Sequence, residues 1–346
     1  MAASTGEKPS SQPPSSEDPG DENASGKEPL PGGGWRSSSA GFRVSLYFLT
    51  IFMAISLSLT FLMHFLEGPE AVEQLAQTNA EAALDPVLFL WLRVVTLPLV
   101  LGITVLFVLR IDQQPLTWVG MDAPRGSGLH VLMGCLLATL PLGVWLLLVD
   151  PWVESDLLEW SEEAVIGDPW LPLGVGGLLS LSFGFFAIAF LDELIFRGYV
   201  YTSFRDRMSW VHAAGLTNLL ALALQAGHPE IGAVGLINTF LIGMALAAMR
   251  EKTGSLIMPT VFLGLWRVLL GCGLSLPVWG SLYPRLFDHQ LSGPETLTGG
   301  SFGPVGSWLL GALLLPVVAA LAWWVDAEDP GDDDALASAE SSESGG

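Results

Sequence analysis

Long apolar segments without charged residues most constrain how this chain can fold. The first, Val44 to Leu66, contains no Asp, Glu, Lys or Arg. About 20 apolar residues are enough for a helix to cross the roughly 30 Å of hydrocarbon in a bilayer. Further segments of this character are Pro86–Leu109, Val131–Val149, Leu171–Leu191, Val211–Ala226, Ile231–Met249, Leu256–Leu276 and Val305–Val325.

These segments predict helices rather than strands. An open sheet would leave the edge strands unpaired in lipid, and the segments lack the alternation of a membrane barrel. The whole chain is 51% hydrophobic and only 14% charged, whereas soluble proteins are about 25% charged. We therefore expect an all-α protein, a polytopic integral membrane helical bundle with about eight transmembrane helices in the lipid bilayer.

The Lys and Arg residues predict the orientation of this bundle. Arg93 and Arg267 lie inside spans, and Arg285 falls in an outer loop if the N-terminus is cytoplasmic. Cytoplasmic loops of membrane proteins carry an excess of basic residues, so we expect both termini to be cytoplasmic. The basic residues on the cytoplasmic side are then Lys8, Lys27, Arg36, Arg43, Arg110, Arg125, Arg197, Arg205, Arg207, Arg250 and Lys252.

The two ends of the chain differ from the spans. Residues 1–40 are rich in Ser, Pro, Gly and Glu, and residues 326–346 are rich in Asp, Glu and Ser. Neither end has enough apolar surface to offset the entropy of ordering, so both are predicted to be disordered tails. The net charge of −21 would repel a polyanion, which argues against a nucleic-acid partner.

The densest group of ionisable residues closes the fourth span, in the sequence Asp192-Glu193-Leu-Ile-Phe-Arg197. On a helix Glu193 and Arg197 share a face and can pair, while Asp192 is rotated by about 100°. Two carboxylates in different environments are a common way to obtain one ionised base. Ionisable groups at membrane depth are costly and therefore candidates for function. The alternative is an ion pair at the cytoplasmic interface.

Other polar residues at membrane depth are fewer. His228 ends the short fifth span, and Asn218 and Asn238 are expected to make interhelical hydrogen bonds. The chain has no HExxH helix, and its five His are scattered, so a zinc site with two or three His is hard to assemble. No cofactor is expected, although a divalent metal site of one His and two carboxylates stays open.

The charged motif resembles the first motif of the CPBP family of intramembrane proteases. This family includes the type II CAAX prenyl endopeptidases and the Abi-type and bacteriocin-processing proteins. The residues that carry the resemblance are DELIFRGYVYTSF, the later His228, and the TGSL sequence after another span. They lie between about Leu171 and Leu270. The resemblance implies that residues 41–165 are N-terminal transmembrane helices and residues 166–325 the family's core domain.

The resemblance also implies roles for single residues. Asp192 and Glu193 match the acid pair, Arg197 its arginine, and His228 the histidine that helps an acid to activate water. The third motif departs from the family, because Leu263 and Arg267 stand where His and Asn are expected. Arg267 is still a donor at membrane depth, and it could stabilise an oxyanion or pair with Asp192.

The function implied is that of an intramembrane endopeptidase with the catalytic residues Glu193, Asp192, His228 and Arg197, to which we add Arg267 as a candidate oxyanion donor. Its partner would be a membrane-anchored protein or peptide substrate. One alternative is a catalytically degenerate member that acts as a membrane scaffold or chaperone-like partner, and another is a small transporter. The chain is Lys-poor and rich in Ala, Gly and Trp, which favours a bacterium with GC-rich DNA, an inner-membrane location and a peptide precursor as substrate.

Overall fold

The computed structural model describes residues 39–68, 86–124, 126–149, 175–225, 230–283 and 293–327. In these residues the regular structure is helical, apart from one β-bridge between Val278 and Ser281. The all-α fold is therefore confirmed. The longer helices are α1 (Ala40–Glu67), α4 (Pro86–Leu106), α5 (Ser127–Val149), α6 (Val175–Glu193), α8 (Trp210–Gln225), α9 (Ala233–Thr253), α10 (Ile257–Val268) and α12 (Trp308–Asp326).

Short helical segments extend or connect these helices. The π-helices η1 (Phe107–Ile111), η4 (Leu194–Val200) and η5 (Leu269–Gly273) continue α4, α6 and α10. Helix α7 (Tyr201–Arg205) follows η4. The remaining pieces are η2 (Leu116–Val119), α11 (Glu295–Thr298), η6 (Gly300–Phe302) and η7 (Pro304–Gly306).

Each of the predicted spans forms a helix, but the helices differ in length. Six of the described helical segments are long and apolar enough to cross a membrane: Ala40–Phe65, Pro86–Ile111, Ser127–Val149, Gly176–Arg205, Ala233–Thr253 and Trp308–Asp326. The other two are shorter. Helix α8 has 16 residues, and the apolar segment Ile257–Gly273 falls below the length of a full crossing.

The surface of α1 supports a lipid environment. Phe52, Leu57, Phe61 and Phe65 are each more than half exposed, and they lie on a helix with few buried side chains. A contiguous apolar surface of this kind is unfavourable in water. The described residues therefore form a helical bundle whose outer face suits lipid.

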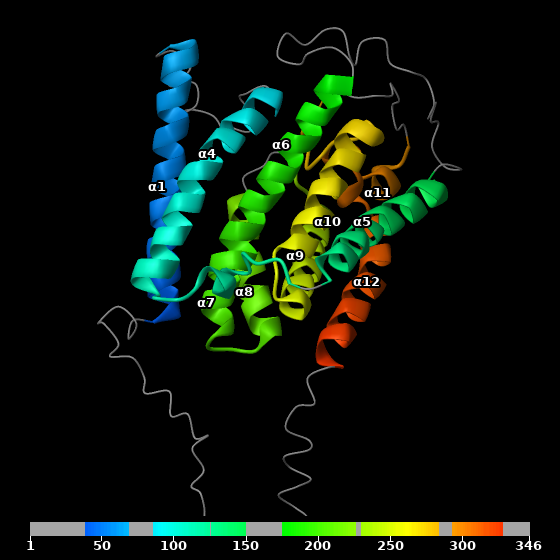
Figure 1. The fold of residues 1–346 in the computed structure, drawn as a ribbon. Helices are drawn as coiled ribbons and strands as arrows, with labels where there is room; N and C mark the ends of the chain where they lie inside the picture. The colour runs from blue at the N-terminus through cyan, green and yellow to red at the C-terminus, as the bar shows by residue number, and fades with distance from the viewer. Residues whose placement is uncertain are drawn as a thin grey trace, which may run out of the picture. The chain divides into compact units, whose positions relative to one another are not determined.

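Neighbouring helices bring distant parts of the chain together in Figure 1. Helix α4 packs against α1 and α6, and α10 packs against α6 and α5. Helix α9 lies between α8 and α12. Helices α4, α6, α8, α9 and α10, which carry residues of the site described below, are thus linked by direct helix contacts.

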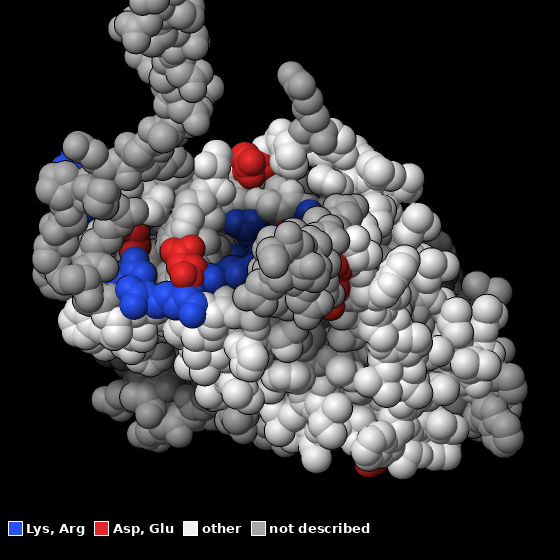
Figure 2. Space-filling view, turned by 90° about the horizontal axis from the view of Figure 1, so that it is seen from below, with Lys and Arg blue, Asp and Glu red and all other residues white. Residues whose placement is uncertain are grey.

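Helix α1 begins and α12 ends at the same end of the bundle, the lower end in Figure 1. The last turn of α9, with Arg250 and Lys252, lies there too. The Lys252 amino group donates to the backbone oxygen of Trp324 at 2.7 Å, which ties α9 to the end of α12. Figure 2 looks at this end of the bundle, and the Lys and Arg side chains gather in one part of the face.

The TGSL sequence forms the tight connection between α9 and α10. Gly254 has a φ of 68°, in the left-handed region that a helix end favours and that glycine adopts without strain. The Ser255 hydroxyl accepts from the backbone N–H of Ile257 and donates to the backbone oxygen of Asp122 at 2.8 Å. This connection fixes the start of α10 and therefore the position of Arg267, which lies in the last turn of that helix.

Candidate active site

Two arginines from neighbouring helices hold Asp192, near the end of α6. Arg93 of α4 donates to its Oδ1 at 2.5 Å, and Arg267 of α10 donates to its Oδ2 at 2.6 Å. The Asp192 side chain is 15% exposed. One carboxylate therefore joins α4, α6 and α10, and both arginines that the sequence places inside spans are paired with it.

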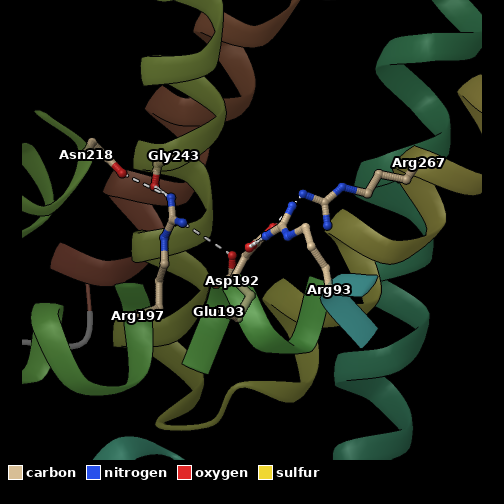
Figure 3. Close-up of polar contacts among 7 residues, drawn as sticks. All are labelled: Arg93, Asp192, Glu193, Arg197, Asn218, Gly243 and Arg267. Atoms are coloured by element: carbon tan, nitrogen blue, oxygen red, sulfur yellow. Dashed lines mark hydrogen bonds and ion pairs between the residues drawn. The ribbon is translucent and has the colours of Figure 1, made fainter. Parts of the chain in front are cut away.

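Glu193 lies on another face of α6 and is fully buried. Its Oε1 is 3.4 Å from Nη1 of Arg197, so the pair expected from the four-residue spacing is formed. Neither carboxylate oxygen of Glu193 accepts a hydrogen bond from any described residue. Figure 3 shows Arg197 on one side of the two carboxylates, with Arg93 and Arg267 on the other.

Arg197 links η4 to two further helices. Its Nη2 donates to Oδ1 of Asn218 on α8 at 3.0 Å and to the backbone oxygen of Gly243 on α9 at 3.3 Å. A Cβ atom on Gly243 would lie 2.3 Å from the Asn218 Oδ1. Because Gly243 has no side chain, Asn218 and the Arg197 guanidinium can lie against the backbone of α9.

A cavity of about 290 Å³ opens beside these residues. Asp192, Arg93, Arg197, Arg267 and Asn218 contribute polar groups to its wall, and Glu193 does not line it. Most of the other lining residues are apolar, among them Leu90, Phe185, Ile188, Ile242, Leu246 and Leu263. The arrangement is a largely apolar chamber with one carboxylate and several N–H donors in its wall.

His228 lies outside the described residues, so its place is not part of this geometry. The residues on either side of that segment, Gln225 at the end of α8 and Ile231 before α9, both line the cavity. Within the described parts of the chain, no three His, Cys, Asp or Glu side chains come together as metal ligands do.

Some contacts had no counterpart in the sequence prediction. The Arg267 guanidinium lies 5.3 Å from the ring centre of Trp279, a residue of the same cavity wall. Asp112, just after η1, pairs with Arg43 of α1 and accepts from the Tyr199 hydroxyl at 2.8 Å. Arg43 and Asp112 both stand at span ends predicted to be cytoplasmic. Their equal depth in the membrane is the sequence feature that could have indicated this pair.

Asn238 has the packing role expected of it. Its Nδ2 donates to the backbone oxygens of Val305 and Ser307, at 2.7 and 2.8 Å, and so connects α9 to the start of α12. Asn218, by contrast, contributes to the cavity wall as well as to the contact between α8 and η4.

The fold and the site define a polytopic helical membrane protein with paired charges inside its spans. Residues 174–269 match the family described as type II CAAX prenyl endopeptidase Rce1-like. This match supports the CPBP/CAAX protease family that the motifs suggested, and the matched residues include Asp192, Glu193, Arg197 and Arg267. No curated protein and no solved structure matches the chain.

Proposed function

We propose that this protein is an intramembrane endopeptidase that hydrolyses a peptide bond of a membrane-anchored protein or peptide. The observation that carries the proposal is the place of Asp192, the first acid of the family motif. It stands in the wall of an apolar cavity among α4, α6 and α10, inside the segment that matches the CAAX protease family.

Asp192 is the better placed of the two acids to act as general base. Only Asp192 lines the cavity. Its two arginine bonds use one lone-pair site on each oxygen, and an ionised carboxylate has about four. The arginines thus orient the carboxylate and leave it able to accept a proton from water. Glu193 would act through Arg197, which it helps to hold.

In the proposed reaction the oxygen of a water molecule attacks the peptide carbonyl while its proton passes to Asp192. As the C–N bond breaks, protonated His228 gives its proton to the leaving amine, and Asp192 then returns the proton taken from water to His228. Gln225 and Ile231, which flank the segment of His228, both line the cavity. General acid–base help of this kind is worth about 100- to 10,000-fold.

The negative charge on the carbonyl oxygen needs donors, and the third-motif His and Asn are replaced by Leu263 and Arg267. The Nη1 of Arg267 has no hydrogen-bond partner among the described residues, and the residue is 8% exposed. A fixed donor where charge develops in a dry site is typically worth about 3 kcal/mol of transition-state stabilisation. We assign Arg267 to this oxyanion.

The test is cleavage of a panel of membrane-anchored peptides by the purified protein. We expect Asp192→Asn and His228→Ala to lose about 100-fold or more in rate, and Arg267→Leu to lose activity through the oxyanion. Glu193→Gln serves as the matched control, because it has the same charge change at the next residue but lies off the cavity wall. It should retain more activity than Asp192→Asn when the rates are compared per folded protein.

A second candidate function is that of a catalytically degenerate scaffold or chaperone-like membrane partner. The observation that favours it is the double arginine bond of Asp192, together with the loss of the third-motif His and Asn. In that case the folded wild type would cleave none of the peptides, and His228→Ala would leave the host phenotype intact. Cleavage that depends on Asp192 and His228 would exclude it.

We also propose that the protein resides in a bacterial inner membrane with both termini cytoplasmic, and that its substrate is a peptide precursor or the sorting tail of an exported protein. The Lys and Arg distribution along the chain supports the orientation. The Lys-poor, Ala- and Gly-rich composition supports the bacterial source.

A further inference from the structure

We propose that Trp279 is a positioning residue, whose ring holds the Arg267 guanidinium so that Nη1 of Arg267 stays available to the substrate. The catalytic consequence rests on the proposed function, in which this Nη1 stabilises the oxyanion. The holding itself stands on three features of the structure. These are the backbone conformation of Trp279, the anchoring of its turn and the contacts of the Arg267 side chain.

Trp279 has a backbone conformation that a bulky residue rarely adopts. Its φ is 50°, and that of Gly280 is 83°. Val278 and Ser281 on either side form the β-bridge, with two backbone hydrogen bonds of 2.9 and 3.2 Å. A two-residue turn with positive φ at both central positions normally has Asn, Asp or Gly at the first of them. Such strain in a bulky residue costs stability and is typical of functional sites.

The neighbouring chain anchors this turn from two sides. The backbone N–H of Gly280 donates to the backbone oxygen of Phe302 at 3.2 Å. On the other side Val278 is buried, and a Cβ on Gly271 of η5 would lie 3.1 Å from its Cγ2. The Nε1 of Trp279 has no hydrogen-bond partner among the described residues. The anchored turn, rather than a hydrogen bond of the indole, therefore sets the position of the ring.

The ring of Trp279 lies against Arg267. The guanidinium carbon of Arg267 is over the ring, 5.3 Å from its centre, and both residues line the cavity. A cation over an aromatic face is attracted by the ring, most strongly by that of Trp, and the attraction is larger where water is excluded. Arg267 is only 8% exposed. The strained turn thus places an aromatic face where it stabilises a buried guanidinium.

Asp192 and Trp279 hold the same guanidinium in different ways. Asp192 accepts from Nη2 at 2.6 Å, and this single hydrogen bond would still let the guanidinium turn about it. The ring of Trp279 opposes that rotation. Nη1, which has no partner among the described residues, is then kept in one place. A donor is effective in catalysis when its position is fixed before the reaction.

The first experiment is denaturant unfolding of the detergent-solubilised full chain, which needs no substrate. Trp279→Leu, Arg267→Gln and the double variant form a cycle that isolates the interaction between the two side chains. Arg267→Gln can still donate to Asp192, so it should fold. We expect the two changes to be coupled by about fivefold or more in the equilibrium constant of unfolding.

Two further cycles with Arg267→Gln are the controls. Trp279→Phe keeps an aromatic face, so its coupling to Arg267→Gln should be smaller than that of Trp279→Leu. Trp323→Leu, at a position 73% exposed on α12, should show no coupling. A ring that only fills space would give additive effects in all three cycles.

The second experiment measures kcat and KM for cleavage of the membrane-anchored peptides, per folded protein. An interaction made only in the transition state acts on kcat and leaves KM nearly unchanged. We expect Trp279→Leu to lower kcat about tenfold or more, with KM within about threefold of the wild type. Trp279→Phe should retain most of the kcat. With Arg267→Gln already present, Trp279→Leu should cost little more, because the group that it positions is gone.

Additive effects on unfolding in the cycle of Trp279→Leu with Arg267→Gln would overturn the proposal. An equal loss of kcat from Trp279→Leu with and without Arg267 would also overturn it. Because unfolding is measured without cleavage, the two proposals can fail separately. Coupling in a protein that cleaves none of the peptides would retain the held guanidinium and remove the protease. Cleavage that depends on Asp192, without coupling, would retain the protease and remove the role of Trp279.

Discussion

Asp192 and Glu193 are adjacent in the chain, yet their carboxylates have different surroundings. Asp192 accepts from Arg93 and Arg267 and lines the cavity. Glu193 is fully buried beside Arg197 and receives no hydrogen bond from a described residue. The rotation of about 100° between successive helical residues separates them. Helical geometry alone thus gives two neighbouring acids separate partners.

Gly243 is the residue whose change tests this packing most directly. The Cβ of Gly243→Ala would lie 2.3 Å from the Asn218 Oδ1 and 3.0 Å from the Arg197 Nη2. Asn218 would have to move and its hydrogen bond with Arg197 would be lost. We expect the free energy of unfolding to fall by about 1–3 kcal/mol, measured by denaturant unfolding in detergent, and peptide cleavage to fall with it.

The control is Gly215→Ala on α8, where a Cβ would meet nothing within 4 Å. Alanine is the better helix former, so this variant should keep its stability or gain up to about 1 kcal/mol. If the two variants lost the same stability, crowding against Asn218 would not be the cause of the effect at Gly243.

At the scale of elements, α1 is attached to the bundle through a few polar and aromatic contacts. Arg43 pairs with Asp112 beyond η1, and the Tyr47 hydroxyl hydrogen-bonds Thr104 of α4 at 2.8 Å. The Tyr47 ring stacks on Tyr199 of η4 with 4.0 Å between ring centres. Val44 and Ile51 of α1 are also buried in the apolar cluster that contains Tyr47 and Tyr199, so polar, aromatic and apolar contacts together decide where α1 docks.

Asp112→Asn should weaken this attachment strongly, because it leaves the Arg43 guanidinium, in a residue only 6% exposed, without its anion. Removing one partner of a buried ion pair typically costs about 3–5 kcal/mol. Tyr199→Phe removes one hydrogen bond to the same carboxylate and should cost about 1–2 kcal/mol. Denaturant unfolding in detergent measures both, and equal losses would contradict the ion-pair argument.

At the same scale, the helices themselves followed from the apolar segments, whereas their lengths did not. The fifth and seventh predicted spans became α8 and the α10–η5 helix, both shorter than a full crossing. Hydropathy reports apolar composition. The end of a helix also depends on contacts such as the Ser255 hydroxyl with the backbone of Asp122.

For the whole molecule, the even number of predicted spans and the basic residues lead to a prediction of topology. The start of α1 and the end of α12 lie at the same end of the bundle (Figure 1). In a bacterial host, a green fluorescent protein fused to the C-terminus should fluoresce, and alkaline phosphatase fused there should be inactive. Alkaline phosphatase fused after residue 68, at the other end of α1, is the positive control. An active phosphatase at the C-terminus would contradict the topology.

Local patterns in the sequence were enough to predict the helical bundle, the positions of its helices and the pair of Glu193 with Arg197. Each of these depends on residues close together in the chain, where helical periodicity fixes the spacing. The motifs also indicated the family that residues 174–269 match.

Tertiary structure decided which arginine meets which acid. The sequence placed Arg93 and Arg267 inside spans and offered Asp192 as one possible partner of Arg267, but it named no partner for Arg93. Both arginines bond Asp192 from different helices. Trp279 beneath Arg267 and the backbone of Gly243 beside Arg197 join the site only through helix packing. Such contacts depend on how each helix is rotated against its neighbours, which periodicity within one helix does not determine.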